Sequence, residues 1–374
     1  MKLTINSSRL SKALAKCMPA ISNNIALPIC GDFLFSLTGS ELHISATDTT
    51  LYITTIVLPD TIDIEGTATC QAASLNNLMK TLPDQPITLE IKDGGMHIQS
   101  NNGSYTLPTG DPEDFPQPTI DPLEKKDYWL VKKEQFVELV NATTFASSND
   151  MLRLAMAGVN LIFHEEKLTG VATNAHCLSE YVIGQLDKYK NDEKEYHFNC
   201  TKESLAAAAQ LHGEDIHIYG NHNSIVIYDD QTRIYSTLID RRFVDYRRIM
   251  PTSHSKTATV DRSELLSSIK RVSALSNQTS NSISLSFSEG GIEVAGADDM
   301  HGRSGAERIS HTSYTGDDIM IHFDFKLAIS TISRISAPEI MINMNEPNNP
   351  MVAIPHTTGN SIAHTCLIMP QMPQ

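Results

Sequence analysis

The chain has 374 residues, of which 40% are hydrophobic and 20% charged, and its formal net charge is −15. No apolar run approaches the roughly 20 residues that a membrane-crossing helix needs, and the N-terminus carries no secretory segment. The length predicts two to three domains in a cytoplasmic protein, and the acidity argues against a protein that coats nucleic acid with its whole surface. This charge is still compatible with a basic surface on one side of the protein.

The six cysteines lie far apart in the sequence and form no Cys-x-x-Cys pair. This spacing favours neither a disulfide framework nor a zinc site of the usual kind. We therefore expect reduced, mostly buried thiols and no metal or cofactor. The six positions are Cys17, Cys30, Cys70, Cys177, Cys200 and Cys366.

One stretch occurs in three versions along the chain. Its middle copy begins at Leu168 and reads Leu-Thr-Gly-Val-Ala-Thr-Asn-Ala-His-Cys-Leu, and weaker copies begin at Leu42 and Ile292. The spacings, 168 − 42 = 126 and 292 − 168 = 124 residues, correspond to about one domain each. The chain is therefore interpreted as three versions of one domain.

The first unit is predicted to contain two similar halves. A short strand at 3–5, with Ser7 or Ser8 as N-cap, leads into a helix over 9–18, and alternating strands follow at 32–37, 42–47 and 51–57. A second helix over 74–82 precedes strands at 87–91, 96–100 and 104–107. Each half thus reads as strand, helix and three strands, and a proline-rich connector closes the unit.

The later units repeat this order. Helices are predicted over 133–146, 202–211, 262–275 and 325–335, with alternating strands between them. We expect an α+β fold of three similar domains with antiparallel sheets, divided as 1–122, 123–252 and 253–374.

Several predicted helices carry cations and few acids on their polar faces. The helices that contain Lys12, Lys80 and Lys326 have no acidic residue beyond a capping position. An ordinary solvated helix face would explain any one of them, but repetition favours a common polyanion, and the lack of interleaved aromatic residues favours non-specific contact with duplex phosphates. The candidate DNA-facing residues are Arg9, Lys12, Lys16, Lys80, Lys202, Lys270, Arg271, Lys326 and Arg334.

Catalysis is an alternative that the sequence supports weakly. His176 and Cys177 could serve as base and nucleophile of a hydrolase, but adjacent residues of a strand point to opposite faces. Asp298 and Asp299 have no metal-ligand spacing with the histidines, and no glycine-rich phosphate loop is present. A β-rich scaffold that never meets DNA is a third reading.

Three motifs carry a resemblance to a known family. They are Ala172 to Leu178, the segment Leu-Ile-Asp-Arg-Arg-Phe-Val-Asp-Tyr-Arg-Arg-Ile-Met-Pro that begins at Leu238, and Leu-Ile-Met-Pro from Leu367. Asp-Phe-Pro at Asp114 and Leu-Pro-Ile at Leu27 fit the same pattern. Together they resemble the bacterial DNA polymerase III beta subunit, the sliding clamp, over the whole chain.

The resemblance implies a head-to-tail homodimeric ring of six similar domains, with helices lining a central hole and sheets outside. Such a ring encircles duplex DNA without sequence preference, performs no chemistry, and tethers the replicative polymerase. It also implies as partners the DNA polymerase III alpha subunit, the clamp loader and other proteins with a clamp-binding motif, in the cytoplasm at the nucleoid. No membrane partner is expected.

The resemblance further implies a groove between the second and third domains that receives a partner's linear peptide. It points to Met156, Thr173, Ala175, His176, Cys177, Leu178, Val244, Arg248, Ile249, Leu327, Leu367, Ile368, Met369, Pro370 and Met372. Ala175, Cys177 and Val244 depart from the family's usual Gly, Arg and Pro. For ring closure it implies Tyr105 and Leu107 of one chain against Ala274 and Leu275 of the other.

Overall fold

A computed structural model describes residues 1–22, 27–118, 128–150, 152–188, 194–311, 313–356 and 363–372. The chain packs as two compact units. The first unit comprises Met1–Phe136, Asp187–Asp192 and Cys200–Leu238, and the second comprises Val137–Leu186, Glu193–Asn199 and Ile239–Gln374. The division runs through the predicted central domain, and the expected boundary at 122/123 lies outside the described residues, so the three-domain limits stay a prediction.

The first repeat contains strand, helix and three strands twice over, and the strand that opens its second half was not located from the sequence. Its elements are β1 (Lys2–Asn6), α1 (Ser7–Cys17), β2 (Asp32–Thr38), β3 (Glu41–Thr47), β4 (Leu51–Val57), β5 (Thr61–Ile64), β6 (Gly66–Gln71), α2 (Ala72–Thr81), β7 (Pro86–Lys92), β8 (Gly95–Gln99) and β9 (Ser104–Pro108), with short 3-10 turns η1 (Met18–Ala20), η2 (Pro28–Gly31) and η3 (Pro112–Asp114). β5 and β6 were not predicted.

The second repeat follows the same order. It contains β10 (Trp129–Lys132), α3 (Lys133–Thr143), η4 (Thr144–Ala146), η5 (Leu154–Met156), β11 (Val159–His164), β12 (Lys167–Thr173), β13 (Cys177–Ile183), β14 (Asp187–Lys188), β15 (Tyr196–Cys200), α4 (Lys202–Ala208), β16 (Asp215–Gly220), β17 (Ser224–Tyr228), β18 (Thr232–Thr237) and η6 (Tyr246–Arg248). β13, β14 and β15 were not predicted.

The third repeat closes the described chain. It contains β19 (Lys256–Asp261), α5 (Arg262–Ser273), β20 (Ser282–Ser288), β21 (Gly291–Asp298), η7 (Asp299–His301), β22 (Arg303–Ile309), β23 (Ser313–Thr315), β24 (Ile319–Asp324), α6 (Phe325–Arg334), β25 (Glu339–Met344), β26 (Met351–Pro355) and β27 (His364–Ile368).

Local signals explain where the helices begin. Asn6, rather than the predicted Ser7 or Ser8, caps α1 because its side chain accepts hydrogen bonds from the N–H groups of Ser8 and Arg9. Asp261 and Asp324 cap α5 and α6 in the same way. A strand therefore ends on Asn or Asp, and the helix that follows starts at the next residue.

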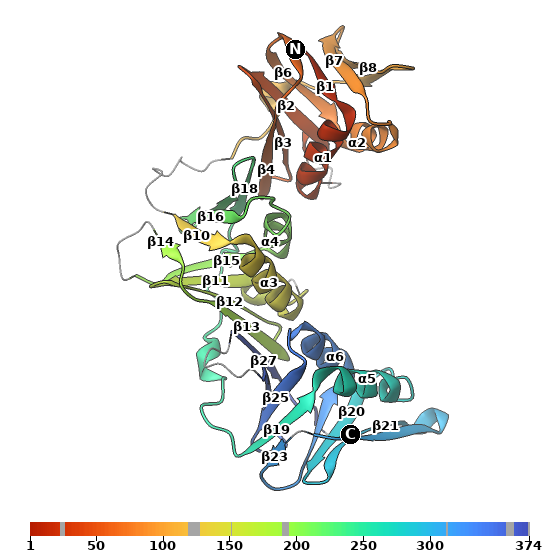
Figure 1. Ribbon diagram of the computed structural model, residues 1–374, viewed down its shortest axis with the longest axis vertical. Helices are drawn as coiled ribbons and strands as arrows, with labels where there is room; N and C mark the ends of the chain where they lie inside the picture. The colour runs from red at the N-terminus through yellow and green to blue at the C-terminus, as the bar shows by residue number, and fades with distance from the viewer. Residues whose placement is uncertain are drawn as a thin grey trace. The chain divides into compact units, whose positions relative to one another are not determined.

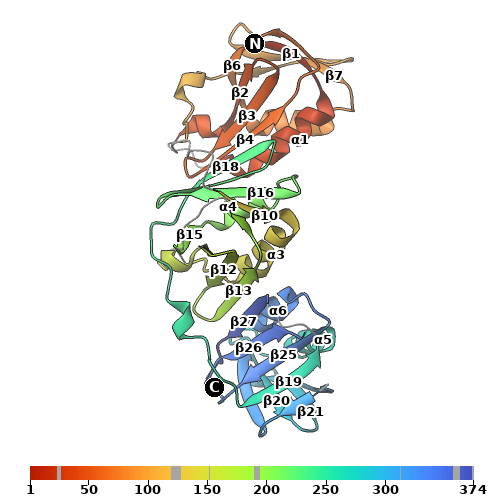
Figure 2. The same cartoon turned by 60° about the vertical axis from the view of Figure 1, so that its left-hand side comes forward.

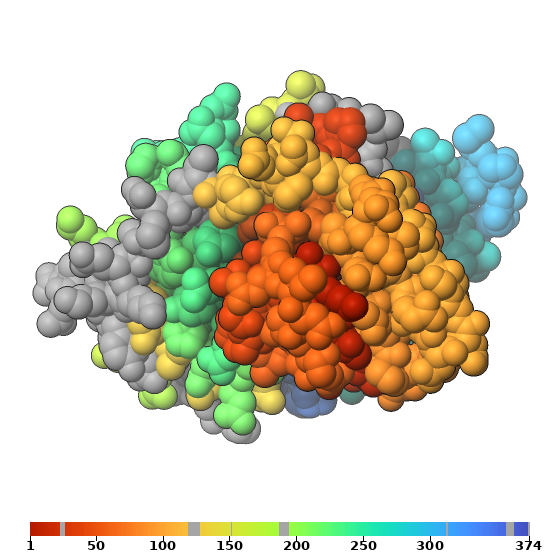
Figure 3. All heavy atoms as spheres, turned by 90° about the horizontal axis from the view of Figure 1, so that it is seen from above, coloured from red at the N-terminus to blue at the C-terminus, as the bar shows by residue number. Residues whose placement is uncertain are grey.

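The described residues form four antiparallel sheets. The first unit has a five-stranded sheet, β5-β1-β7-β8-β9, and a nine-stranded sheet, β14-β10-β16-β17-β18-β4-β3-β2-β6. The second unit has a nine-stranded sheet, β15-β11-β12-β13-β27-β26-β25-β19-β23, and a four-stranded sheet, β22-β21-β20-β24. In the second unit α5 and α6 lie side by side, as Figures 1 and 2 show. Figure 3 views the first unit from the end that its earliest segments form, coloured red to orange.

Each nine-stranded sheet joins a strand of one repeat to a strand of the next. β18 pairs with β4, so that Tyr235 lies opposite Tyr52. β27 pairs with β13, so that Ile368 lies opposite Cys177. Main-chain hydrogen bonds thus continue from repeat to repeat.

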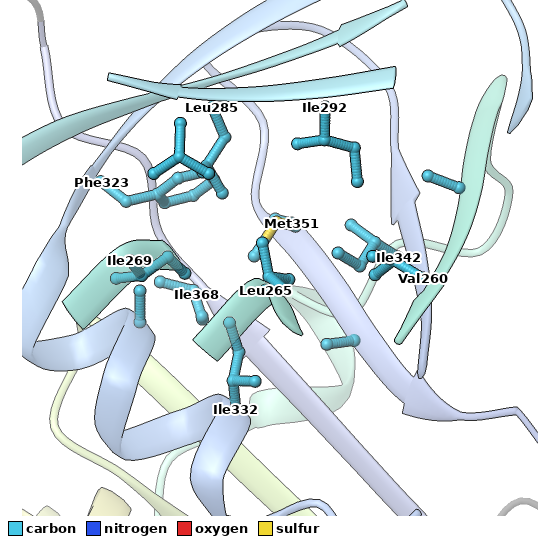
Figure 4. Packing of buried hydrophobic residues seen from close by; sticks show 14 of the residues in the cluster. Val260, Leu265, Ile269, Leu285, Ile292, Phe323, Ile332, Ile342, Met351 and Ile368 are labelled. Carbon is cyan, nitrogen blue, oxygen red and sulfur yellow. The ribbon is translucent and has the colours of Figure 1, made fainter. Parts of the chain in front are cut away.

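A large core of the second unit lies between α5, α6 and the sheets of the third repeat. Leu265 and Ile269 of α5, Ile332 of α6, and Leu285 and Phe323 of the four-stranded sheet all belong to this core (Figure 4). The six cysteines are reduced and buried, which confirms the expectation from their spacing. No helix in the described part of the chain is long and apolar enough to cross a membrane.

Gly170 provides a test of this packing. A Cβ atom at Gly170 would lie 2.5 Å from Cδ2 of Leu139 on α3, whereas a Cβ atom at Gly184 would meet nothing within 4 Å. We predict that Gly170→Ala lowers the free energy of unfolding by roughly 1–3 kcal/mol, because overpacking a tight contact forces side chains from their rotamers. Urea denaturation measures the change, and Gly184→Ala is the matched control. Equal effects of the two substitutions would contradict this packing.

Candidate functional site

A tight turn joins β12 to β13 at the centre of the candidate groove. The Asn174 Oδ1 atom accepts hydrogen bonds from the N–H groups of His176 and Cys177, each 2.9 Å long. The Thr173 hydroxyl donates to the carbonyl oxygen of Cys177 at 2.7 Å. Ala175 has φ +75°, a left-handed conformation that costs a residue with a Cβ atom free energy. The turn is therefore rigid and strained, and it presents Ala175 and His176 to solvent.

The upstream copy of the motif forms the same turn. Asp48 Oδ1 accepts from the N–H groups of Thr50 and Leu51, the Thr47 hydroxyl donates to the Leu51 carbonyl, and Thr49 has φ +80°. The sequence repeat at Leu42 and Leu168 thus corresponds to one local structure. The third copy differs: its Asp298 accepts from Nδ1 of His301 at 2.8 Å, and Gly302 takes the left-handed conformation.

The connector that follows β18 covers the outer face of β11, β12 and β13. Tyr246, 5% exposed, joins an apolar cluster with Ile162, Leu178 and Leu367, and its hydroxyl donates to Oε1 of Glu180 at 2.6 Å. Neighbouring residues of the connector remain near the surface. Val244 is half-buried, Arg248 pairs with Asp245 at 2.7 Å, and Ile249 is 48% exposed.

The C-terminal tail is fixed beside the turn. The N–H of Met369 donates to the carbonyl oxygen of His176 at 2.8 Å, and the N–H of Gln371 donates to that of His322 at 2.7 Å. The Gln371 side chain also donates to the carbonyl oxygen of Ser280 at 3.2 Å. Met369 and Met372 are 36% and 75% exposed, so two methionines flank a pinned segment.

The predicted groove residues separate into two groups. Those with side chains at least partly accessible are Met156, Ala175, His176, Val244, Arg248, Ile249, Leu327, Met369, Pro370 and Met372, whereas Thr173, Cys177, Leu178, Leu367 and Ile368 are buried. Ile368 points into the core of the third repeat. Sequence reasoning did not select Tyr246 or Gln371. The repeated Asp-aromatic pair, Asp114-Phe115 and Asp245-Tyr246, was a signal for the first of these.

A buried polar network lies where β13 meets β27. The Ser179 hydroxyl donates to the Ala142 carbonyl oxygen at 2.6 Å and lies 2.9 Å from Nε2 of His364. The Cys366 Sγ atom lies 3.1 Å from the same ring nitrogen. Burial lowers the pKa of His364 to about 4, so the imidazole is neutral at pH 7 and can serve as an acceptor. Nothing in the sequence pattern pointed to this network.

The predicted DNA-facing cations all lie on helices: Arg9, Lys12 and Lys16 on α1, Lys80 on α2, Lys202 on α4, Lys270 and Arg271 on α5, and Lys326 and Arg334 on α6. Two are already held by acids. Arg9 lies 3.0 Å from Asp60, and both Nε and Nη2 of Arg271 donate to the Glu307 carboxylate. No acidic group in the described parts of the chain forms an ion pair with Lys80, Lys326 or Arg334.

The predicted closure residues lie at two sheet edges. Tyr105 and Leu107 are on β9, the last strand of the five-stranded sheet. Leu275, 40% exposed, lies against Gly305 of β22, the last strand of the four-stranded sheet, and Ala274 precedes it.

The chemistry of Cys177 does not support a hydrolase. The side chain is buried, and burial raises the pKa of its thiol to about 11, so almost no thiolate is present at pH 7. No group of three or more metal-ligating side chains occurs among the residues that the structure describes.

The chain consists of three tandem repeats of sheet and helix. Three of the helices carry cations and few acids, and an exposed turn lies beside the C-terminal tail. These features together define a clamp-type fold. Family models of the DNA polymerase III beta subunit match its N-terminal domain at residues 1–121, its central domain at 130–245 and its C-terminal domain at 247–371. The chain therefore belongs to this family of bacterial sliding clamps, which are processivity factors of DNA replication and not enzymes.

Full-length relatives agree with this assignment. The beta sliding clamp of Caulobacter vibrioides is 25% identical over 366 residues, covering 95% of this chain and 96% of the relative. That of Synechocystis sp. is 25% identical over 395 residues, covering 99% of each. A crystal structure of a Pseudomonas aeruginosa sliding clamp bound to griselimycin has the same fold, with a TM-score of 0.93, 21% identity and full coverage of both chains.

His364 makes stability depend on pH. Since its pKa falls from 6.5 to about 4 on folding, the unfolded chain binds the proton more tightly. The neutral His364 therefore contributes stability above pH 6.5, and this contribution is lost as the pH falls towards 4. Relative to His364→Gln, the wild type should lose on the order of 3 kcal/mol over that range, measured by urea denaturation. Parallel pH profiles of the two proteins would contradict the assigned role.

Proposed function

We propose that this chain forms a head-to-tail homodimeric ring around duplex DNA, where it tethers the polymerase and docks other replication and repair proteins. The proposal rests on the strand numbers of the sheets: two sheets have nine strands, whereas the other two have five and four. Each nine-stranded sheet consists of five strands from one half-repeat and four from its neighbour. The five-stranded sheet ending in β9 and the four-stranded sheet ending in β22 have the strand numbers that the two halves of a third such sheet would need.

Pairing β9 of one copy with β22 of another would complete that sheet. Antiparallel edge strands offer unpaired N–H and C=O groups, and a heterologous contact of this kind closes into a ring when the rotation allows it. Three repeats per chain and two chains give the six domains of the family's ring. Tyr105, Leu107, Ala274 and Leu275 would then lie at the joint.

The acid-poor helices support contact with DNA in the hole. Cations on α1, α2 and α6 would contact duplex phosphates without recognising bases. The net charge of −15 means that the rest of the surface would not bind DNA tightly. Arg9 and Arg271, already bound to acids, would contribute less than Lys12, Lys80 and Lys326. Action at the nucleoid in the cytoplasm follows from this role.

The groove is proposed as the docking site for a partner's linear peptide. Accessible groove residues surround the turn and tail, with apolar Ile249, Met369 and Met372 available for apolar anchors. Methionine side chains adapt to several partners. The polymerase III alpha subunit and the clamp loader are the expected partners, and Ala175, Cys177 and Val244 would alter peptide preference.

A covalently closed ring tests the topology. Leu107→Cys and Leu275→Cys, linked by a bis-maleimide after assembly on nicked circular duplex DNA, should give a protein that stays on the circle. The six native cysteines are buried and should react slowly. Linearising the DNA should release the ring, which gel filtration detects. Equal retention on circular and linear DNA would refute encirclement.

A charge in the groove tests docking. Met369→Lys should weaken binding of a peptide from the polymerase's clamp-binding segment at least tenfold, because it places an ammonium group in an apolar site. Ile64→Lys, on β5 and 58% exposed, is the control and should leave affinity unchanged. Fluorescence anisotropy measures both. Unchanged affinity for Met369→Lys would remove the tail from the docking site.

A further inference from the structure

The outer sheet face of the first repeat is covered by the chain's own connector, the first strap (residues 109–118). The strap crosses β6 where the N–H of Gly110 donates to the Thr69 hydroxyl at 2.8 Å. Its Phe115, 3% exposed, then packs on Leu34 and Tyr52, with the Tyr52 and Phe115 rings edge to face at 6.4 Å. One aromatic side chain thus covers part of this face, and a smaller hollow of about 340 Å³ remains beside it.

The second repeat repeats the arrangement with the second strap (residues 239–250). It crosses β15 where the N–H of Ile239 donates to the carbonyl oxygen of Asn199 at 2.9 Å. Tyr246 then packs on the outer face of β11 to β13, in the cluster that contains Leu178. Strand register makes Leu178 the counterpart of Tyr52, because each lies opposite the threonine that opens the shared turn, Thr173 or Thr47.

The third repeat begins the same path, and among the described residues no strap follows on its outer face. Gln371 crosses β24 through its hydrogen bond to His322, as Ile239 crosses β15. Beyond it, a hollow of about 650 Å³ lies on the outer face of β20 to β22. The described residues that line it include no Phe, Tyr or Trp. Ser304, opposite Ala297, occupies the position of Tyr52 and Leu178.

We propose that this hollow is a second docking site, which receives an extended segment of a partner protein with one aromatic side chain. The occupant follows from the two sister faces, where an extended segment packs Phe115 or Tyr246 onto the corresponding strands. By strand register, Ser284, Ala295 and Ala306 replace the larger Leu34, Ser45 and Thr54 of the first repeat and leave room for such a ring. Met300, 87% exposed at the rim, adds a flexible apolar contact.

The C-terminal tail connects this hollow with the groove. Gln371 is bonded to His322 and Ser280, which both line the hollow, and Met369 lies two residues earlier at the turn. A partner peptide anchored in the groove would therefore have the second site within reach. The choice of a protein partner rests on the proposed function, whereas the site itself does not require a ring or DNA.

The first strap supplies a probe. We would present the full chain with the peptide Asp-Pro-Glu-Asp-Phe-Pro-Gln, the sequence of residues 111–117, with benzoylphenylalanine in place of Phe. Photocross-links mapped by mass spectrometry should fall on β20 to β22. Ala295→Trp should reduce their yield at least tenfold by filling the hollow, and Met320→Trp, on the same face but outside the hollow, should not. If Ala295→Trp fails to fold, Ser304→Tyr, which copies Tyr52, serves in its place.

Two controls separate this site from the groove. Met369→Lys should leave cross-linking at β20 to β22 unchanged even where it abolishes binding of the polymerase peptide. A peptide with Ala in place of Phe should compete at least tenfold more weakly than the Phe peptide. The proposal would be overturned if the cross-links fell outside β20 to β22 or if Ala295→Trp left their yield unchanged. It would also be overturned if the Ala peptide competed as well as the Phe peptide. A change in oligomeric mass on filling the hollow would overturn it too, because that result would assign the hollow to a second copy.

Discussion

Main-chain pairing between repeats is the constraint on which the rest of this structure depends. β4 pairs with β18 and β13 pairs with β27, so two of the sheets run on from one repeat to the next. Buried backbone groups must find partners, and a shared sheet satisfies them at a junction without a large apolar interface. The same rule leaves β9 and β22 as edges whose pairing would close a ring.

The candidate groove lies beside one such junction, between β13 and β27. The turn at Thr173 to Cys177 recurs at Thr47 to Leu51, hydrogen bond for hydrogen bond, yet the neighbouring side chains differ. In the first copy Tyr52, Tyr235 and Phe115 fill the space beside the turn. In the second, smaller side chains and a tail fixed by Met369 and Gln371 leave methionines accessible. A common framework therefore supports a packed junction in one place and a candidate docking site in another.

Much of the fold could be predicted from local patterns. Helical periodicity located all six helices to within a few residues, and the repeat at Leu42, Leu168 and Ile292 identified the shared architecture. β5, β14 and β15 were missed because they are short or polar and are strands only through pairing with distant partners. The cap of α1 was misplaced by one or two residues because Asn6, Ser7 and Ser8 are all good caps and only the structure decides among them.

The site was predicted less completely, because it depends on long-range contacts. Accessible groove residues such as His176 and Ile249 came from motif resemblance, whereas the Ser179, His364 and Cys366 network joins residues that no local pattern relates. Burial also removes Ile368 from any direct contact with a ligand.

The central claim is that two copies of this chain close one ring through the β9 and β22 edges. Light scattering coupled to gel filtration tests it most directly, because the mass of a single chain is 41.2 kDa. We expect a species of twice that mass that persists on dilution and reverts to one chain when Thr106→Pro removes an N–H group from the free edge of β9. A native protein with the mass of a single chain at micromolar concentration would contradict it.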